Sequence, residues 1–177
     1  LTGAQKKVIK EIRKDFLSGQ HMNRLLQGDV GSGKTLVADF SIDYFVSLGK
    51  KVIYTSPIKA LSNQKFHEFS IKFPHINFGI LTGDIKFNPN ADVLIMTTEI
   101  LQNTLFLRQS KLSKLSKQSN TNLLTQTQTQ TQTQTQTQTQ SSYTHFEMDI
   151  DNELACVVFD EVHYINDEDR GKVWEQT

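Results

Sequence analysis

The apolar residues of this chain recur with two alternating spacings, one typical of helices and the other of strands. In the segment from Ala4 to Leu17, apolar residues lie at near-helical spacing with Lys and Glu between them, and this predicts an amphipathic helix. Gly19 follows as a stop signal. The same spacing predicts three further helices: Lys34–Leu48, about Lys59–Phe69 after Pro57, and Thr98–Arg108 with Thr98 as a candidate N-cap.

Short apolar runs between the helices predict strands. The expected strands are Asn23–Gln27, Lys51–Thr55, Ile80–Thr82, Val93–Thr97 and Leu154–Phe159. Strands that alternate with helices of this length indicate a parallel sheet with helices on both faces. The predicted fold class is therefore α/β, with a mostly parallel sheet. The aromatic residues Phe66, Phe69 and Phe73 follow helical spacing, so we predict that they belong to the core.

The alternation of elements stops at about residue 109. Thr125–Gln140 consists of eight uninterrupted Thr-Gln pairs, and the residues before it are mostly Lys, Ser, Leu, Gln and Asn. The pairs have the period of a strand, but neither face is apolar, so they cannot form a core. We interpret residues 109–152 as a disordered, low-complexity insertion in a surface loop. Its origin is either simple repeat expansion or a role in partner recruitment or Thr phosphorylation.

The composition of the chain indicates how it could bind nucleic acid and in which cellular compartment it is expected. The 177 residues suffice for one domain with its own core, and 19 basic and 19 acidic residues give a formal net charge of +0. A nucleic-acid site must therefore be a local patch or a set of backbone amides. Cys156 is the only cysteine, so no disulfide can form within the chain, which suits a reducing compartment. We expect an intracellular protein, nuclear or cytoplasmic, with no membrane span. The chain starts without Met, so we expect it to be a piece of a longer protein.

One segment fits the pattern of a phosphate-binding loop, G-x-x-x-x-G-K-[ST]. Its glycines let the backbone curl so that several N–H groups point at one anion, and the following helix adds its positive N-terminal end. Lys34 can reach the β- and γ-phosphates of ATP, and the Thr35 hydroxyl can bind Mg²⁺. The candidate nucleotide-binding residues of this P-loop are Gly28, Asp29, Val30, Gly31, Ser32, Gly33, Lys34 and Thr35.

A second signal follows the last predicted strand. The apolar run Leu154–Phe159 ends in the sequence Asp160-Glu161-Val162-His163. A buried parallel strand that delivers two adjacent carboxylates is what a P-loop nucleoside triphosphatase needs for metal and water. Together, the two motifs predict a nucleoside triphosphatase core.

These motifs resemble the first RecA-like domain of superfamily 2 helicases, and most closely the DExH RNA helicases of the superkiller type. The resemblance spans most of the chain except the insertion. The stretches that carry it are Val52–Lys65, Leu81–Asp84, Ile95–Leu101, Val158–Tyr164 and Asp169–Glu175.

The N-terminal part of the chain resembles a different type of helicase. Leu1–Ala38 is more similar to the RecG type of DNA helicase, through Leu1–Gln5 and Leu25–Thr35. A RecG-like DNA helicase or translocase is therefore the first alternative to an RNA helicase. A non-motor module that uses ATP as a switch is the second, although such a switch has no need of Glu161.

The resemblance implies roles for individual residues. Lys34 would neutralise phosphate charge, Asp160 would hold Mg²⁺, and Glu161 would orient or deprotonate the attacking water. His163 would couple the nucleotide state to nucleic acid, and Gln5 would contact adenine. The resemblance also implies that residues 1–177 are an ATP-binding domain that is incomplete at its C-terminus. Its partners would be single-stranded or duplex RNA, with DNA as the alternative, and a second RecA-like domain of the same parent chain.

Small polar residues follow several predicted strands. The carboxyl ends of parallel strands meet at one edge of a sheet, where ligands usually bind. Hydroxyls, helix-start amides and one lysine suit contacts with phosphates rather than bases. N-capping by Ser56, Thr97 and Thr98 is the other interpretation, and both roles can hold at once. Asp84 and Glu99 have the wrong charge for phosphate contact, so we assign them scaffold roles. The candidate nucleic-acid-binding residues are Ser56, Pro57, Lys59, Thr82, Gly83, Thr97 and Thr98.

Overall fold

A computed structural model describes residues 1–121 and 148–166 of the chain. Within these residues, five strands form one sheet in the order β3-β2-β4-β1-β5. Strands β2, β4, β1 and β5 pair in parallel, and β3 pairs antiparallel with β2. The predicted mostly parallel sheet is therefore confirmed. The strands are β1 (Lys51–Ser56), β2 (Phe78–Leu81), β3 (Lys86–Phe87), β4 (Val93–Thr97) and β5 (Leu154–Phe159).

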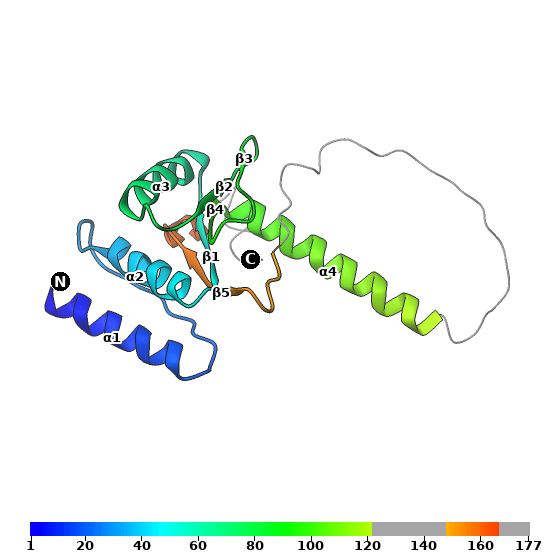
Figure 1. The fold of residues 1–177 in the computed structure, drawn as a ribbon, viewed down its shortest axis with the longest axis horizontal. Coiled ribbons are helices and arrows are strands. Elements are labelled where there is room, and N and C mark those ends of the chain that lie inside the picture. Colours follow the sequence, from blue (N-terminus) through cyan, green and yellow to red (C-terminus); the bar gives the residue numbers. More distant parts are fainter. Residues whose placement is uncertain (122–147, 167–177) are drawn as a thin grey trace.

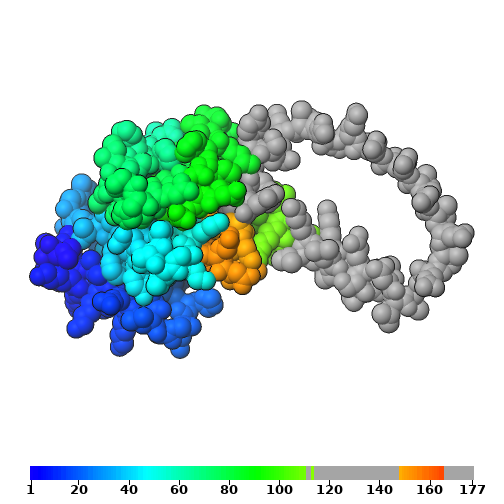
Figure 2. Space-filling model, viewed as in Figure 1, coloured from blue at the N-terminus to red at the C-terminus, as the bar shows by residue number. Residues whose placement is uncertain are grey.

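Helices cover both faces of this sheet, as predicted. Helices α2 and α3 pack on one face, α4 packs on the other, and α1 lies against the outer side of α2 (Figures 1 and 2). The ring of Phe16 in α1 stacks on that of Tyr44 in α2, which joins these two helices. The helices are α1 (Gly3–Leu17), α2 (Lys34–Ser47), α3 (Lys59–Lys72), α4 (Thr98–Thr121) and the short 3₁₀ helix η1 (Val162–Asn166).

The core has two halves because the central strands are buried on both faces. In β1, Val52 and Tyr54 point toward α2 and α3, whereas Ile53 points toward α4. Phe69 of α3 is fully buried in the first half, and Phe66 and Phe73 pack against it. The prediction that these three aromatic residues belong to the core is confirmed.

The predicted strand Asn23–Gln27 is wrong, because these residues form no strand in the structure. A strand needs a paired neighbour for its backbone N–H and C=O groups, and no described strand pairs with this segment. The segment lies against α1 instead. There Arg24 forms ion pairs with Asp15 and with Glu11, the latter at 3.1 Å. Leu25 is exposed.

Helix α4 is longer than predicted. It begins at Thr98 but continues to Thr121, whereas the sequence predicts an end at Arg108 and a disordered insertion over residues 109–152. Residues 109–121 contain Lys, Leu and Gln, which favour helix, and no Gly or Pro. This composition explains why the helix continues past Arg108. Its C-terminal part extends away from the sheet (Figure 1). The Thr-Gln repeat lies outside the described residues. None of the described helices is long and apolar enough to cross a membrane.

Strand β3 has two residues, too few for a periodic sequence signal, and it brings the backbone of Asn88 against Gly79 of β2. A Cβ atom on Gly79 would lie 2.1 Å from the Asn88 carbonyl oxygen and 2.8 Å from a Leu94 methyl carbon. We expect Gly79→Ala to lower the free energy of unfolding by about 1–3 kcal/mol, because backbone must move to accept the methyl group.

Chemical denaturation would measure this effect. Gly3→Ala is the matched control, because nothing lies within 4 Å of a Cβ atom placed there. Equal denaturation midpoints for Gly79→Ala and the unmodified chain would contradict the close packing of β2 against this turn.

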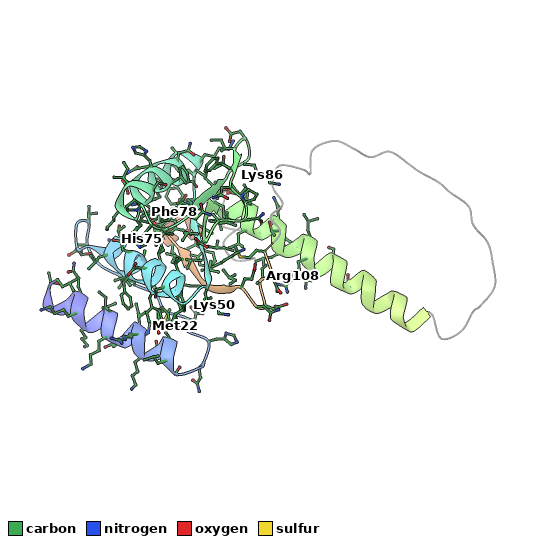
Figure 3. The ribbon with its side chains drawn as sticks, viewed as in Figure 1. Met22, Lys50, His75, Phe78, Lys86 and Arg108 are labelled. Atoms are coloured by element: carbon green, nitrogen blue, oxygen red, sulfur yellow. The ribbon has the colours of Figure 1, made fainter. Side chains whose placement is uncertain are left out.

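The direction of α2 decides where the candidate site lies. Only residues 48–50 join the end of α2 to the start of β1, and α2 packs along β1 and β5. The N-terminus of α2 therefore lies toward the carboxyl ends of these strands. At the opposite end, the Lys50 ammonium donates to the Asn152 carbonyl oxygen at 2.9 Å and Arg108 pairs with Asp151 (Figure 3). These contacts fix the chain segment that enters β5.

Candidate functional site

The P-loop forms a tight turn before α2. The Ser32 N–H donates to the Asp29 carbonyl oxygen at 3.1 Å. Gly31 (φ 78°) and Gly33 (φ 82°) both have left-handed backbone conformations, which glycine adopts without steric cost. Gly33 is the N-cap of α2, so the loop directly precedes the positive end of that helix. Among the P-loop residues only Gly33 is half-buried, and the other seven are exposed: Gly28, Asp29, Val30, Gly31, Ser32, Lys34 and Thr35.

Lys34 is the first residue of α2, and its side chain folds over the loop. The Lys34 Nζ donates to the carbonyl oxygens of Gly28 at 2.8 Å and of Asp29 at 2.9 Å. The ammonium group therefore lies at the mouth of the loop, where a bound phosphate would meet it. Gly28 is closely packed as well, since a Cβ atom there would lie 2.7 Å from the Ser32 Oγ.

Gln5 lies beside the P-loop although 27 residues separate it from Ser32. Its Nε2 donates to the Ser32 carbonyl oxygen at 2.9 Å. Its Oε1 accepts from the Thr2 N–H at 2.8 Å, which completes a capping box with the Thr2 hydroxyl. The Gln5 amide thus fastens α1 to the loop. Its contact with adenine stays a prediction.

Asp160 follows β5, and both of its carboxylate oxygens accept hydrogen bonds. Oδ2 accepts from the Tyr54 hydroxyl at 2.5 Å, and Oδ1 accepts from the Glu161 N–H at 3.0 Å. The Asp160 N–H donates to the Thr55 carbonyl oxygen at 2.9 Å, so its backbone continues the pairing of β5 with β1. The sequence alone does not identify Tyr54 as a site residue, because an aromatic residue within an apolar run is typical of the core.

Glu161 and His163 lie next to each other at the start of η1. Glu161 has a left-handed backbone conformation with φ 54°, which is uncommon for a residue with a side chain. This turn brings the Glu161 Oε2 to 3.2 Å from the His163 Nδ1. Both side chains are substantially exposed. The imidazole of His163 therefore contacts the carboxylate that is predicted to orient the attacking water.

The carboxyl ends of β1, β2 and β4 bring most of the candidate nucleic-acid residues together, but the structure buries several of them. The Ser56 Oγ lies 2.6 Å from the Ser62 Oγ of α3. Thr98 is the first residue of α4 rather than its N-cap, and its Oγ1 lies 3.5 Å from the Ser56 carbonyl oxygen. Neither hydroxyl caps a helix. The buried candidates are Ser56, Pro57, Thr82, Thr97 and Thr98.

Lys59 and Gly83 are the exposed members of this set. The Lys59 Nζ lies 3.0 Å from the Asp84 Oδ1, which also accepts from the Thr82 Oγ1 at 3.0 Å. The hydrogen bond from Lys59, and then that from Thr82, lowers the pKa of Asp84 below its ordinary value. Asp84 therefore holds Lys59 beside Gly83, which agrees with the scaffold role assigned to it.

The donor atoms at this edge suit Mg²⁺. A carboxylate on Asp160 and a hydroxyl on Thr35 are hard oxygen ligands, and nucleotide-bound Mg²⁺ usually takes one or two carboxylates together with phosphate oxygens. Within residues 1–121 and 148–166, no cluster of three His, Cys, Asp or Glu residues could hold a metal by protein ligands alone. The site fits an ion that shares its ligands with a nucleotide.

Comparison with known proteins agrees with this geometry. Residues 2–177 match the DEAD/DEAH box helicase family. The chain is 36% identical over 92% of its length to the antiviral helicase SKI2 of Saccharomyces cerevisiae, and 36% identical over 89% to superkiller complex protein 2 of Homo sapiens. It is 35% identical over 86% to the ATP-dependent RNA helicase mtr4 of Schizosaccharomyces pombe. The chain spans about a tenth of the length of these relatives.

Proposed function

The chain belongs to the DEAD/DEAH box helicase family, and we propose that it is the ATP-binding domain of an RNA helicase driven by ATP hydrolysis. One observation carries the proposal. The P-loop at the start of α2 and the acidic pair Asp160 and Glu161 at the end of β5 lie toward the same edge of the sheet. The relatives named as RNA helicases support RNA as the substrate. The proposed location is intracellular, where such substrates occur.

In this proposal each part of the edge has a separate task. Backbone N–H groups of the P-loop and the ammonium group of Lys34 bind the phosphates of ATP. Thr35 and Asp160 would hold Mg²⁺, which neutralises charge on those phosphates when bound. Glu161 orients the attacking water and accepts its proton, and the neighbouring His163 is suited to respond to the charge of Glu161.

Nucleic acid would bind along the carboxyl ends of β1, β2 and β4. The exposed Lys59 and the backbone at Gly83 are the groups that can reach a phosphate from this surface. The buried hydroxyls of Ser56 and Thr98 would hold the protein backbone at the ends of these strands in place through their hydrogen bonds. Contacts of this kind track a strand without regard to base sequence. We further propose a second RecA-like domain of the same parent chain as the partner that completes the site.

Choice of nucleic acid tests the proposal. We expect single-stranded RNA to stimulate ATP hydrolysis by the full-length protein more than DNA of equal sequence and length. Discrimination must come from 2′-hydroxyl contacts or helix shape, because phosphate contacts are common to both. Phosphate release should be measured with RNA, single-stranded DNA and branched DNA at one fixed salt concentration.

Each alternative has its own result in this experiment. Strong stimulation by branched DNA with none by RNA would favour a RecG-like DNA helicase. ATP binding without hydrolysis under every condition would favour a nucleotide-dependent switch.

A further inference from the structure

The hydroxyl of Tyr54 donates a hydrogen bond to Asp160 of the candidate active site. Tyr54 pairs with Val158 in the β1–β5 register, so Asp160, two residues beyond Val158, lies on the same face of the sheet as Tyr54. This is also the face that packs against α2, the helix that begins with Lys34. The 2.5 Å hydrogen bond from Tyr54 to the Asp160 Oδ2 therefore joins the core directly to the acidic pair.

The ring of Tyr54 cannot easily change its position. Tyr54 is 1% exposed, and its ring packs edge-on against that of Phe69 with 5.2 Å between the ring centres. An ionised carboxylate can only accept hydrogen bonds, so the Tyr54 hydroxyl is the donor to the Asp160 Oδ2. A buried hydroxyl without an acceptor would destabilise the core by about 1–3 kcal/mol. Asp160 supplies the acceptor for the Tyr54 hydroxyl.

Asp160 is held from two sides. Tyr54 donates to Oδ2 and the Glu161 N–H donates to Oδ1, so two donors of the protein itself hold the plane of the carboxylate. Each oxygen has a second lone pair left for a metal-bound water. An unheld carboxylate at a strand end would lose side-chain entropy on binding a metal.

We propose that Tyr54 is a positioning residue whose hydroxyl orients the Asp160 carboxylate toward the Mg²⁺ of bound ATP. This inference rests on the proposed function. It concerns metal-dependent binding of nucleotide and needs no turnover.

Tyr54→Phe tests the inference, because it keeps the buried ring and removes only the hydroxyl. Binding of a fluorescent ATP analogue to the purified chain should be titrated with Mg²⁺, and repeated in EDTA. We expect the Mg²⁺ concentration for half-maximal binding to rise about three- to tenfold, which corresponds to the net contribution of one ordinary hydrogen bond. Affinity in EDTA should change by less than about twofold, because metal-free nucleotide does not use Asp160.

Two further variants separate positioning from general stability. Tyr44→Phe removes a hydroxyl from α2, where the Tyr44 ring stacks on Phe16 and Phe40, and should leave the Mg²⁺ requirement unchanged. In a chain that already carries Asp160→Asn, Tyr54→Phe should raise the Mg²⁺ concentration for half-maximal binding by less than about twofold, because the two residues act as one unit.

The outcomes distinguish this inference from the proposed function. A Mg²⁺ requirement of Tyr54→Phe equal to or below that of the unmodified chain overturns the inference alone. Equal weakening with Mg²⁺ and in EDTA also overturns it, because that pattern indicates damage to the fold. Failure of the unmodified chain to bind nucleotide overturns both.

Discussion

Lys34→Ala is expected to weaken ATP binding by at least about tenfold, the cost of losing charge-assisted hydrogen bonds to phosphate. The Lys34 ammonium group lies on the carbonyl oxygens of Gly28 and Asp29 at the mouth of the P-loop. Alanine there removes the one side-chain cation of the P-loop, and the backbone N–H groups that remain cannot neutralise a full charge. Isothermal titration with a non-hydrolysable ATP analogue would measure the effect.

Lys7→Ala is the control for the change in net charge. Lys7 is an exposed residue of α1 outside the P-loop, so its replacement should leave the affinity for the analogue within about twofold. The variant Lys34→Ala should also unfold at nearly the same temperature as the unmodified chain, because Lys34 is exposed. Unchanged affinity in Lys34→Ala would show that the P-loop does not bind the phosphates.

Glu161→Gln is expected to keep ATP binding and to lower the rate of hydrolysis by the full-length protein by about 10²–10⁴-fold. The amide preserves the size of the side chain and the left-handed turn at residue 161, which depends on the backbone. It cannot accept a proton from water. Single-turnover phosphate release and analogue affinity, measured on the same preparation, would separate chemistry from binding.

Glu153→Gln provides a matched control for Glu161→Gln. Glu153 pairs with Lys51 at the opposite end of β5, with 3.2 Å between the Glu153 Oε2 and the Lys51 Nζ, and should have no effect on the chemical step. If Glu161→Gln hydrolyses ATP at a rate near that of the unmodified protein, the assignment of Glu161 as the base is wrong.

The local sequence determined those parts of the fold that depend only on residues close together in the chain, namely three of the strands and the P-loop. The strands β1 and β4 are buried on both faces and β5 is partly buried, and each gives a short run rich in apolar residues that marks the strand in the sequence. The P-loop conformation likewise depends on glycines at fixed positions, since Gly31 and Gly33 both need positive φ. These features place Lys34 and Asp160 at element ends in the sequence, before any tertiary contact is known.

Only the tertiary structure decided what those elements touch. Whether Asn23–Gln27 forms a strand depends on a neighbour to pair with, and the ion pairs of Arg24 with α1 take the place of that pairing. The burial of Ser56 and Thr98 arises because β1, α3 and α4 meet at one point. The contact of Tyr54 with Asp160 spans 106 residues and follows from the β1–β5 register, which no local pattern specifies. Residue types and spacing determined the candidate chemistry, whereas strand pairing and helix packing determined which groups are free to perform it.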